Sequence, residues 1–270
     1  MRHVWHSVDP LARERGYSLV ELMVAILIAL FLIAGVLTVE QSVHNSYADR
    51  SGLAQLDNDE RFTVTLLTEI AQSAGYYPDP ATTSQVAALP VATATAPNGD
   101  ALSFASGQAI YGLHNTTTIN DTTYDVDSIG IRFMTASGDG IPLCDGSSNE
   151  TGSNTVYTNY FYIGTVNGTS YLYCALEAGN NWSATAPVQL VENVEAMQIS
   201  YGLHTTASAT AGDYSVDTYV PAANMTDTDW SEVTAVRIAV TFMNPLQAEA
   251  GQQAATFTKV IALMSRTGGS

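Results

Sequence analysis

An uninterrupted apolar run near the N-terminus constrains this chain more than any other feature. Residues 22–39 read LMVAILIALFLIAGVLTV and contain no charged side chain, and Glu21 and Glu40 stand at the two ends. A run of this length is enough for a helix to span a membrane. The sequence therefore predicts a chain that is held in a membrane by one N-terminal helix.

The flanks of the run decide which kind of membrane segment it is. A secretory signal is cut after its apolar region at a small-x-small site, and the residues that follow here, EQSVHNSYADR, offer none. Arg13 and Arg15 precede the run and favour a cytoplasmic N-terminus. An ordinary signal anchor and a pilin-type leader fit these facts equally well.

The residues just ahead of the run separate these two alternatives. The stretch from Arg13 to Leu22 reads RERGYSLVEL and resembles the class III leader junction of type IV prepilins. In that family a prepilin peptidase cuts after the glycine, and the new first residue, usually Phe, is N-methylated. The resemblance implies cleavage between Gly16 and Tyr17 and methylation of Tyr17. Tyr in place of Phe is a departure that keeps the aromatic ring.

Glu21 is the fifth residue when Tyr17 is counted as the first, which is where the family carries a glutamate. A carboxylate at the start of a membrane helix is costly to bury and is usually functional. The resemblance implies a role in subunit assembly, in which Glu21 pairs with the N-terminal amine of a neighbouring subunit. The alternative is a residue at headgroup level, favoured there by the helix dipole.

A helical pattern continues beyond the apolar run. No proline occurs between Tyr17 and Tyr77, and Gly75 followed by Tyr-Tyr-Pro indicates a helix stop. We expect a helix from Tyr17 to Ala74, about 87 Å long at 1.5 Å per residue, with Ser51-Gly52 as a point where it could break. Its second half carries apolar residues at helical spacing, namely Phe62, Leu66, Leu67, Ile70 and Ala74.

From residue 78 onward the pattern indicates short strands separated by polar turns. Alternation and β-branched content predict strands at 128–134, 156–163, 170–176, 188–203 (one strand or two), 233–242 and 257–264, with a hairpin turn at 166–169. The segments 78–100, 113–125, 138–154 and 204–229 are expected to be loops. The predicted fold class is α+β: a long N-terminal membrane or filament helix packed on a C-terminal, mainly antiparallel β domain.

Several blocks after the apolar run resemble the PilW family of minor pilins, which is related to the J-type minor pseudopilins of type II secretion. These blocks are residues 61–76 at the helix end, Tyr-Leu-Tyr-Cys at 171–174, Leu-Val-Glu-Asn-Val-Glu at 190–195 leading to Tyr201-Gly202, and Asp-Trp-Ser at 229–231 leading to 236–238. We therefore divide the chain into a leader peptide at 1–16, a transmembrane and filament-core helix at 17–40, an amphipathic half-helix at 41–75 and an exported β-rich domain at 76–270.

The resemblance implies a structural role in a pilus. Minor pilins of this kind prime pilus assembly, sit at or near the tip, and support twitching motility and adhesion. The implied partners are other minor pilins, the major pilin, a tip adhesin-like protein, the prepilin peptidase and the inner membrane. The implied location is a single pass through the inner membrane, with the N-terminus cytoplasmic and the C-terminal domain periplasmic, and then the extracellular pilus. A J-type pseudopilin, or an adhesive binding module on a pilin anchor, is the alternative.

Charge and cysteine content bear on the exported domain. Residues 41–270 hold 22 acidic and 6 basic side chains, a balance that repels phosphate groups, so we expect no nucleic-acid binding. Cys144 and Cys174 are the only cysteines. In an exported domain such a pair favours one disulfide bond, with two buried free thiols as the alternative.

Motifs of enzymes, cofactor sites and metal sites are missing from the sequence. It holds no G-x-S-x-G, H-E-x-x-H or phosphate-binding loop, so we expect no enzyme, no cofactor and no metal. Asp139, Asp145 and Glu150 surround Cys144 in a glycine-rich loop and could bind Ca²⁺, but their spacing is not that of an EF-hand, which favours a solvated loop. Arg132 and Arg237 lie in predicted strands, where we expect them to form ion pairs.

Overall fold

The computed structural model describes residues 16–119, 122–179, 181–182, 186–205, 215–246 and 254–264. The chain divides into two compact units, Met1–Ser51 and Gly52–Ser270, and helix α1 (Leu19–Gln72) contributes to both. Arg13, Arg15 and the rest of the expected leader before Gly16 lie outside the described residues.

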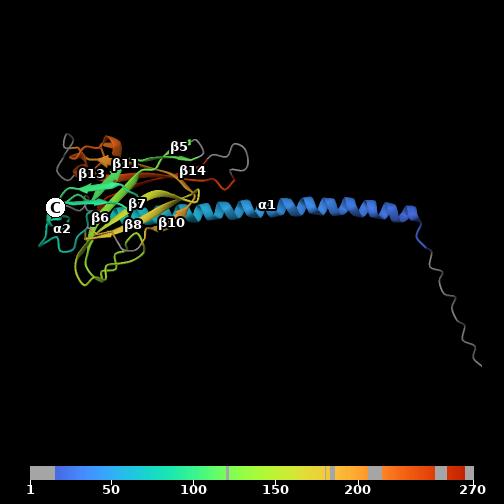
Figure 1. Cartoon of the computed structure of the whole chain (residues 1–270), viewed down its shortest axis with the longest axis horizontal. Helices are drawn as coiled ribbons and strands as arrows, with labels where there is room; N and C mark the ends of the chain where they lie inside the picture. The colour runs from blue at the N-terminus through green and yellow to red at the C-terminus, as the bar shows by residue number, and fades with distance from the viewer. Residues whose placement is uncertain are drawn as a thin grey trace, which may run out of the picture. The chain divides into compact units, whose positions relative to one another are not determined.

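The first unit is the N-terminal part of α1, drawn in blue in Figure 1. It begins at Leu19, where the amide of Leu22 donates to the carbonyl of Ser18 at 3.1 Å. Its interior has no proline, so every turn can form its backbone bonds. The hydroxyl group of Thr38 donates to the carbonyls of Ala34 and Gly35 within the helix, and α1 continues through Ser51-Gly52 without a break.

The C-terminal part of α1, from Gly52 onward, belongs to the second unit and packs against the rest of that unit along one face. Thr63, Leu67, Ile70 and Ala71 are buried there, at the three- and four-residue spacing of one helix face. Phe62 does not belong to this face, because it precedes Thr63 by one position, and its side chain is 48% exposed. The sequence prediction was therefore wrong for Phe62.

The end of α1 lies within two residues of the predicted position. The helix ends at Gln72. Gly75 then adopts φ = 76°, a left-handed conformation that glycine takes without strain. The amide of Gly75 donates to the carbonyl of Arg132 at 2.9 Å, and the amide of Met134 donates to the carbonyl of Tyr76 at 2.8 Å. The chain leaving the helix is thus bonded to a strand.

Two antiparallel sheets form most of the second unit, as the α+β prediction required (Figure 1). The larger sheet has the order β10-β8-β7-β6-β3, with β9 also paired to β8. Its strands are β3 (Ile110–Leu113), β6 (Ser128–Thr135), β7 (Thr155–Val166), β8 (Thr169–Ala178), β9 (Asn181–Trp182) and β10 (Val188–Glu192). The second sheet has the order β12-β11-β13-β14. Its strands are β11 (Val194–Leu203), β12 (Thr218–Pro221), β13 (Val233–Phe242) and β14 (Ala255–Ala262).

The central strands follow the predicted alternation. On β6 the side chains of Ile129, Ile131 and Phe133 are all buried on one face. The turn between β7 and β8 has positive φ at Asn167 (52°) and Gly168 (85°), as a two-residue hairpin turn of type I′ requires. The predicted strand 233–242 is β13, while the last strand, β14, begins and ends two residues earlier than expected.

Several segments that the sequence assigned to loops, or left unassigned, are regular. They are the short helix α2 (Gln85–Ala88), two small hairpins, formed by β1 (Ala92–Thr95) with β2 (Ala101–Phe104) and by β4 (Thr116–Ile119) with β5 (Thr122–Asp125), the strand β12, and the 3-10 turns η2 (Ala222–Asn224) and η3 (Asp229–Glu232). All of these elements are short. Many of their side chains are Thr, Ala or Asn, so the apolar alternation that marks a strand is weak.

Two apolar clusters hold the unit together. The larger joins α1 to the inner faces of both main sheets and includes Leu67, Ile131 and Ile238. The smaller lies on the other face of the six-stranded sheet, where the β1–β2 hairpin covers it, and includes Phe104 and Tyr160. Because β6 and β7 are covered on both faces, residues that the alternation places outside are buried as well.

Candidate functional site

The junction that resembles a leader cleavage site lies immediately before α1. Gly16, Tyr17 and Ser18 are not helical, and the side chain of Tyr17 is 82% exposed. An added Cβ atom at Gly16 would meet nothing within 4 Å, so the fold of the described residues does not require glycine there. A requirement for glycine at this position would therefore come from recognition by a peptidase and not from packing.

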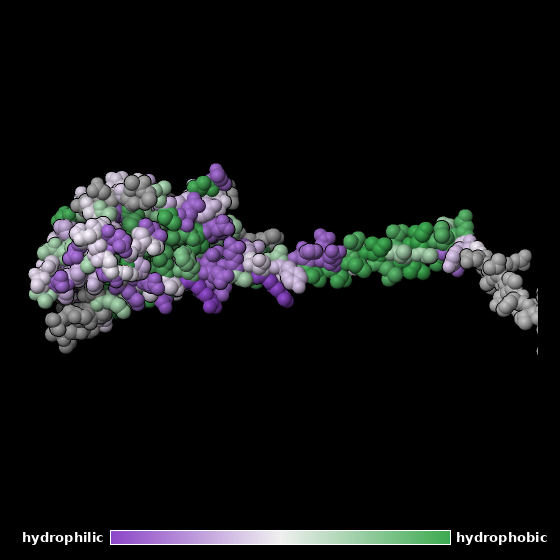
Figure 2. All heavy atoms as spheres, turned by 90° about the horizontal axis from the view of Figure 1, so that it is seen from below, coloured by the Kyte–Doolittle hydropathy of each residue, from purple (hydrophilic) through white to green (hydrophobic). Residues whose placement is uncertain are grey.

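The helix that follows the junction presents an unusual surface. All described residues of the first unit are exposed, including large side chains such as Leu22, Phe31 and Val39. The best 18-residue window of α1 has a mean hydropathy of 3.0 and none of it is buried. Figure 2 shows this part of α1 as a continuous band of hydrophobic side chains. An apolar surface of this size is not stable in water and requires lipid or protein around it.

Glu21 lies in the first turn of this helix. With Ser18 just ahead of Leu19, the sequence Ser-x-x-Glu has the spacing of a capping box, and the dipole of the helix favours an anion there. Among the described residues no ion pair or side-chain hydrogen bond involves the carboxylate of Glu21. A membrane or a filament would therefore surround a carboxylate that has no partner among the described residues of its own chain.

The disulfide bond expected from the sequence is present in the second unit. It joins Cys144 to Cys174 on β8, with their Cα atoms 5.9 Å apart, and both residues are buried. The amide of Cys144 also donates to Oδ1 of Asn159 on β7 at 2.8 Å. The disulfide bond and this hydrogen bond together hold the loop 136–154 against the larger apolar cluster.

The carboxylates of this loop accept hydrogen bonds from backbone amides and serine hydroxyls of the same loop. Asp139 accepts hydrogen bonds from the amides of Ala136 and Ile141, and Asp145 accepts from the amide and hydroxyl of Ser147. Glu150 accepts from the hydroxyl of Ser148. These contacts are typical of polar turns, and among the described residues no group of three His, Cys, Asp or Glu side chains is arranged to hold a metal ion.

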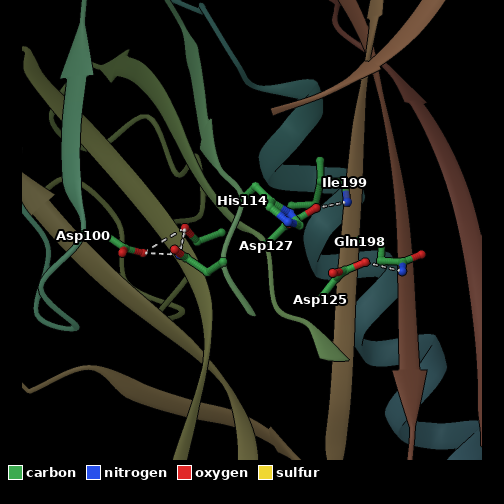
Figure 3. A network of polar contacts seen from close by, with 8 residues as sticks. Asp100, His114, Asp125, Asp127, Gln198 and Ile199 are labelled. Carbon is green, nitrogen blue, oxygen red and sulfur yellow. Dashed lines mark hydrogen bonds and ion pairs between the residues drawn. The ribbon is translucent and has the colours of Figure 1, made fainter. Parts of the chain in front are cut away.

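A buried aspartate joins the two main sheets (Figure 3). Asp127, just before β6, accepts the amide of Ile199 on β11 at 2.7 Å through one oxygen, and its other oxygen lies 2.7 Å from Nδ1 of His114. Burial raises the pKa of Asp127, and the hydrogen bonds from Ile199 and His114 oppose this rise. Beside it, Oδ2 of Asp125 accepts from Nε2 of Gln198 at 2.9 Å.

A second polar cluster lies around Asp100, drawn at the other side of Figure 3. One carboxylate oxygen of Asp100 accepts from Asn98 at 2.8 Å, Asn115 at 2.9 Å and Ser128 at 3.0 Å, and from the hydroxyl of Tyr160. With so many donors on one oxygen, the cluster is a satisfied structural network. Sequence reasoning missed both clusters, because a single Asp in a polar segment gives no signal of its eventual partners.

Arg132 and Arg237 differ from the sequence prediction. Within the described part of the chain neither forms an ion pair. Arg132 is buried, donates to the carbonyl of Pro90 at 2.7 Å and lies over the ring of Phe104, and burial lowers its pKa to about 10. Arg237 is exposed and lies 4.7 Å above the ring of Tyr219. The predicted ion pairs were wrong: Arg132 interacts with Glu177 only beyond ion-pair distance, and the contacts of the two guanidinium groups are to aromatic rings, a backbone carbonyl and the hydroxyl of Ser200.

Comparison with known families adds two matches. Residues 160–267 match the family model described as Type IV Pilus-assembly protein W, and residues 11–37 match the model described as Prokaryotic N-terminal methylation motif. Neither the comparison with curated proteins nor that with solved structures gives a match.

The two matched segments correspond to the features described above. The first contains the junction at Gly16 and most of the apolar run. The second runs from within β7 to beyond β14 and includes Trp230, which packs between the rings of Tyr201 and Tyr111. The resemblance to PilW-like type IV minor pilins is confirmed. The families matched are structural, and the N-terminal motif and apolar helix fit a membrane-anchored pilin.

Proposed function

We propose that this PilW-like chain, which carries a pilin-type methylation motif at its N-terminus, is a minor pilin that takes part in priming type IV pilus assembly. It acts at or near the tip of the pilus and through it supports twitching motility and adhesion. The family matches support the coarser part of this proposal, a minor pilin associated with the type IV pilus. The position at the tip, and the roles in twitching motility and adhesion, go beyond these matches and are part of the proposal.

The observation that carries the proposal is the order of features at the start of the chain. Gly16 and an exposed Tyr17 precede α1, Glu21 lies in its first turn, and the apolar side chains of the run at 22–39 that follows are all exposed. A plain membrane anchor needs only the apolar residues. A carboxylate in its first turn is favoured by the helix dipole but opposes insertion into the membrane. A subunit that leaves the membrane and packs in a filament can use both.

We infer the path of the chain from the same features. The N-terminus lies in the cytoplasm before cleavage, and the β-rich domain lies in the periplasm, where the disulfide bond between Cys144 and Cys174 can form. After cleavage the subunit moves from the inner membrane into the pilus. Its partners are the other minor pilins, the major pilin and a tip adhesin-like protein.

Deletion of the gene tests this function. We expect a strain without it to show few or no surface pili and no twitching, with normal secretion of type II substrates, and we expect the full-length gene to restore the pili. Loss of secretion with normal pili would instead identify a secretion pseudopilin. Normal pili and normal secretion in the deletion strain would contradict the proposal.

A further inference from the structure

The four-stranded sheet has a long open edge at β14. Strand β14 pairs with β13 over eight consecutive residues without a register shift, from Ala235 opposite Ala262 to Phe242 opposite Ala255. Among the described residues, no backbone hydrogen bond joins Ala255–Ala262 to any element other than β13. One side of the strand therefore carries a row of backbone donors and acceptors that have no partner in the part of the chain that the structure describes.

The other edges of the two main sheets are shorter or irregular. Strand β12 has four residues and ends at Pro221, and β3 has four residues. Strand β10 has five residues, with a register irregularity between Gln189 and Val191. Short strands, prolines and bulges are the usual ways in which a protein protects a sheet edge from pairing. Strand β14 has none of these three features, and of the charged side chains that also protect sheet edges it carries one, Lys259.

The sequence of β14 suits pairing with a further strand. It reads ATFTKVIA, without proline or glycine, and its Thr, Phe, Val and Ile residues favour extended backbone. Its inner side is held in place, since Ile261 is buried and Phe257 packs against Phe242 with ring centroids 5.9 Å apart. The open edge is therefore preformed.

The charge of the edge limits what can occupy it. Lys259 is the only charged residue of β14, is exposed, and has no ion pair with a described residue. A second copy of β14 has no carboxylate to place beside it. The complementary segment is an extended one that carries an acidic side chain.

We infer that the open edge of β14 is a docking site for an extended, acidic segment of a partner pilin subunit, which adds to the sheet as a fifth strand. Strand addition of this kind obtains its affinity from main-chain hydrogen bonds and its selectivity from side chains such as Lys259. The inference rests on the proposed function, because it takes the partner from the pilus assembly.

The hydrogen-bond pattern shows which amides are available. The amide of Leu263 donates to Thr234, so it points toward β13. Backbone groups of an antiparallel strand alternate in direction, so the amides of Thr256, Thr258, Val260 and Ala262 point outward. Proline is tolerated on an edge strand where the amide faces solvent, so Thr258→Pro removes an outward donor without removing a bond to β13.

The experiment co-expresses the full-length chain in its membrane with each pilin subunit encoded beside it and measures co-purification in detergent. We expect Thr258→Pro to bind its partner about tenfold more weakly, because one hydrogen bond is lost and the partner's carbonyl is left unpaired. Thr258→Ala, which keeps the amide, should bind within about twofold of wild type. Lys259→Glu should weaken binding, and Arg237→Glu, the same charge reversal on the neighbouring strand, should not.

Residue-resolved hydrogen exchange on the wild-type complex gives a second measurement, independent of whether Thr258→Pro folds. The amides of Thr256, Thr258, Val260 and Ala262 should exchange quickly in the free chain and become protected in the complex. Unchanged exchange at these amides, equal binding by a folded Thr258→Pro variant, or a homodimer joined through β14 would each overturn the inference while leaving the proposed function intact. If the wild-type chain binds none of the pilin subunits, both the inference and the proposed function are overturned.

Discussion

The hydroxyl group of Tyr201 occupies the space into which a Cβ atom on Gly112 would project. Gly112 lies on β3 and Tyr201 on β11, so the two main sheets approach each other closely at a position where one of them has no side chain. The hydroxyl of Tyr201 is buried there and has no hydrogen-bond partner among the described residues.

We expect Gly112→Ala to destabilise the domain by about 1–3 kcal/mol, the usual range for an overpacked core. Tyr201→Phe should be neutral or slightly stabilising, since it removes an unpaired buried hydroxyl. Combining the two changes should recover part of the loss, and thermal unfolding of the three variants measures this. A Gly112→Ala variant with the unfolding temperature of wild type would contradict the close contact between Gly112 and Tyr201.

Removal of the disulfide bond should destabilise the β-rich domain. The bond joins residues 30 positions apart, for which the chain-entropy model gives about 3–4 kcal/mol. The measurement is denaturant unfolding of the Cys144→Ser, Cys174→Ser double variant beside wild type. In the native exported protein neither cysteine should react with maleimide, and labelling of both would contradict the bond.

The mature chain should begin at Tyr17. We expect mass spectrometry of the N-terminal peptide to find a cut between Gly16 and Tyr17 and one added methyl group on the new amine. Gly16→Val should block the cut, although the fold of the described residues leaves room for a side chain at this position. Gly35→Val, inside the apolar run and equally uncrowded, is the matched control and should be cut normally. An intact leader in the wild-type chain would rule out processing as a pilin.

Glu21→Ala should leave membrane insertion and leader cleavage intact and prevent entry into the filament. Without the carboxylate, the N-terminal amine of a neighbouring subunit would be buried without a partner, at a cost of about 3–5 kcal/mol, or more than about a hundredfold in an equilibrium. Glu21→Gln should restore assembly only partly, because it accepts a hydrogen bond but carries no charge.

Glu40→Ala is the control for Glu21→Ala, since Glu40 stands at the other end of the same apolar run and is also exposed. Membrane-fraction protein, pulldown of the other minor pilins and surface pili are measured for each variant. Normal pili and normal pulldown with Glu21→Ala would show that Glu21 is not an assembly contact in this subunit.

Burial raises the pKa of Glu195, a buried residue of β11 whose Oε2 has no hydrogen-bond partner among the described residues. A carboxyl whose folded pKa lies above its unfolded value, about 4.3, binds protons more readily in the native state. Stability therefore rises as the pH falls from neutral through the raised pKa, and it levels off below the unfolded value. Glu195→Gln cannot ionise, so it should be more stable than wild type at pH 7, with the difference shrinking toward about pH 4. Glu192→Gln, at an exposed residue of β10, should change the pH profile much less, and thermal unfolding from pH 4 to 8 compares them.

The elements with strong apolar periodicity could be predicted from the sequence. Strand β13 alternates Val236, Ile238 and Val240 with exposed or small residues, and all three are buried as predicted. Helix α1 was also predictable, because a single charge-free apolar run that spans a membrane must satisfy its own backbone hydrogen bonds, which a helix does. Phe62 was wrongly assigned to the buried face of α1 because it is apolar. The helical spacing from Leu67 and Ile70 instead places Thr63 on that face, and Thr63 is buried.

The polar clusters and the short hairpins could not be predicted in this way. The partners of Asp127 are His114 and Ile199, which lie 13 and 72 positions away in the sequence, and no local pattern brings them together. Arg132 was expected to form an ion pair, yet it is buried on the face of the sheet that the β1–β2 hairpin covers. Such burial depends on a neighbouring segment and is not encoded in the strand itself.

The attachment of the helix end to β6 has a mechanical consequence. The hydrogen bonds from Gly75 to Arg132 and from Met134 to Tyr76 join the chain that leaves α1 to this strand. Strand β6 lies between β3 and β7 and is bonded on both sides. A pulling force transmitted along the helix, such as tension on a filament, would enter the domain through an interior strand and be shared by its two neighbours, so the domain should resist unravelling better than one loaded through an edge strand.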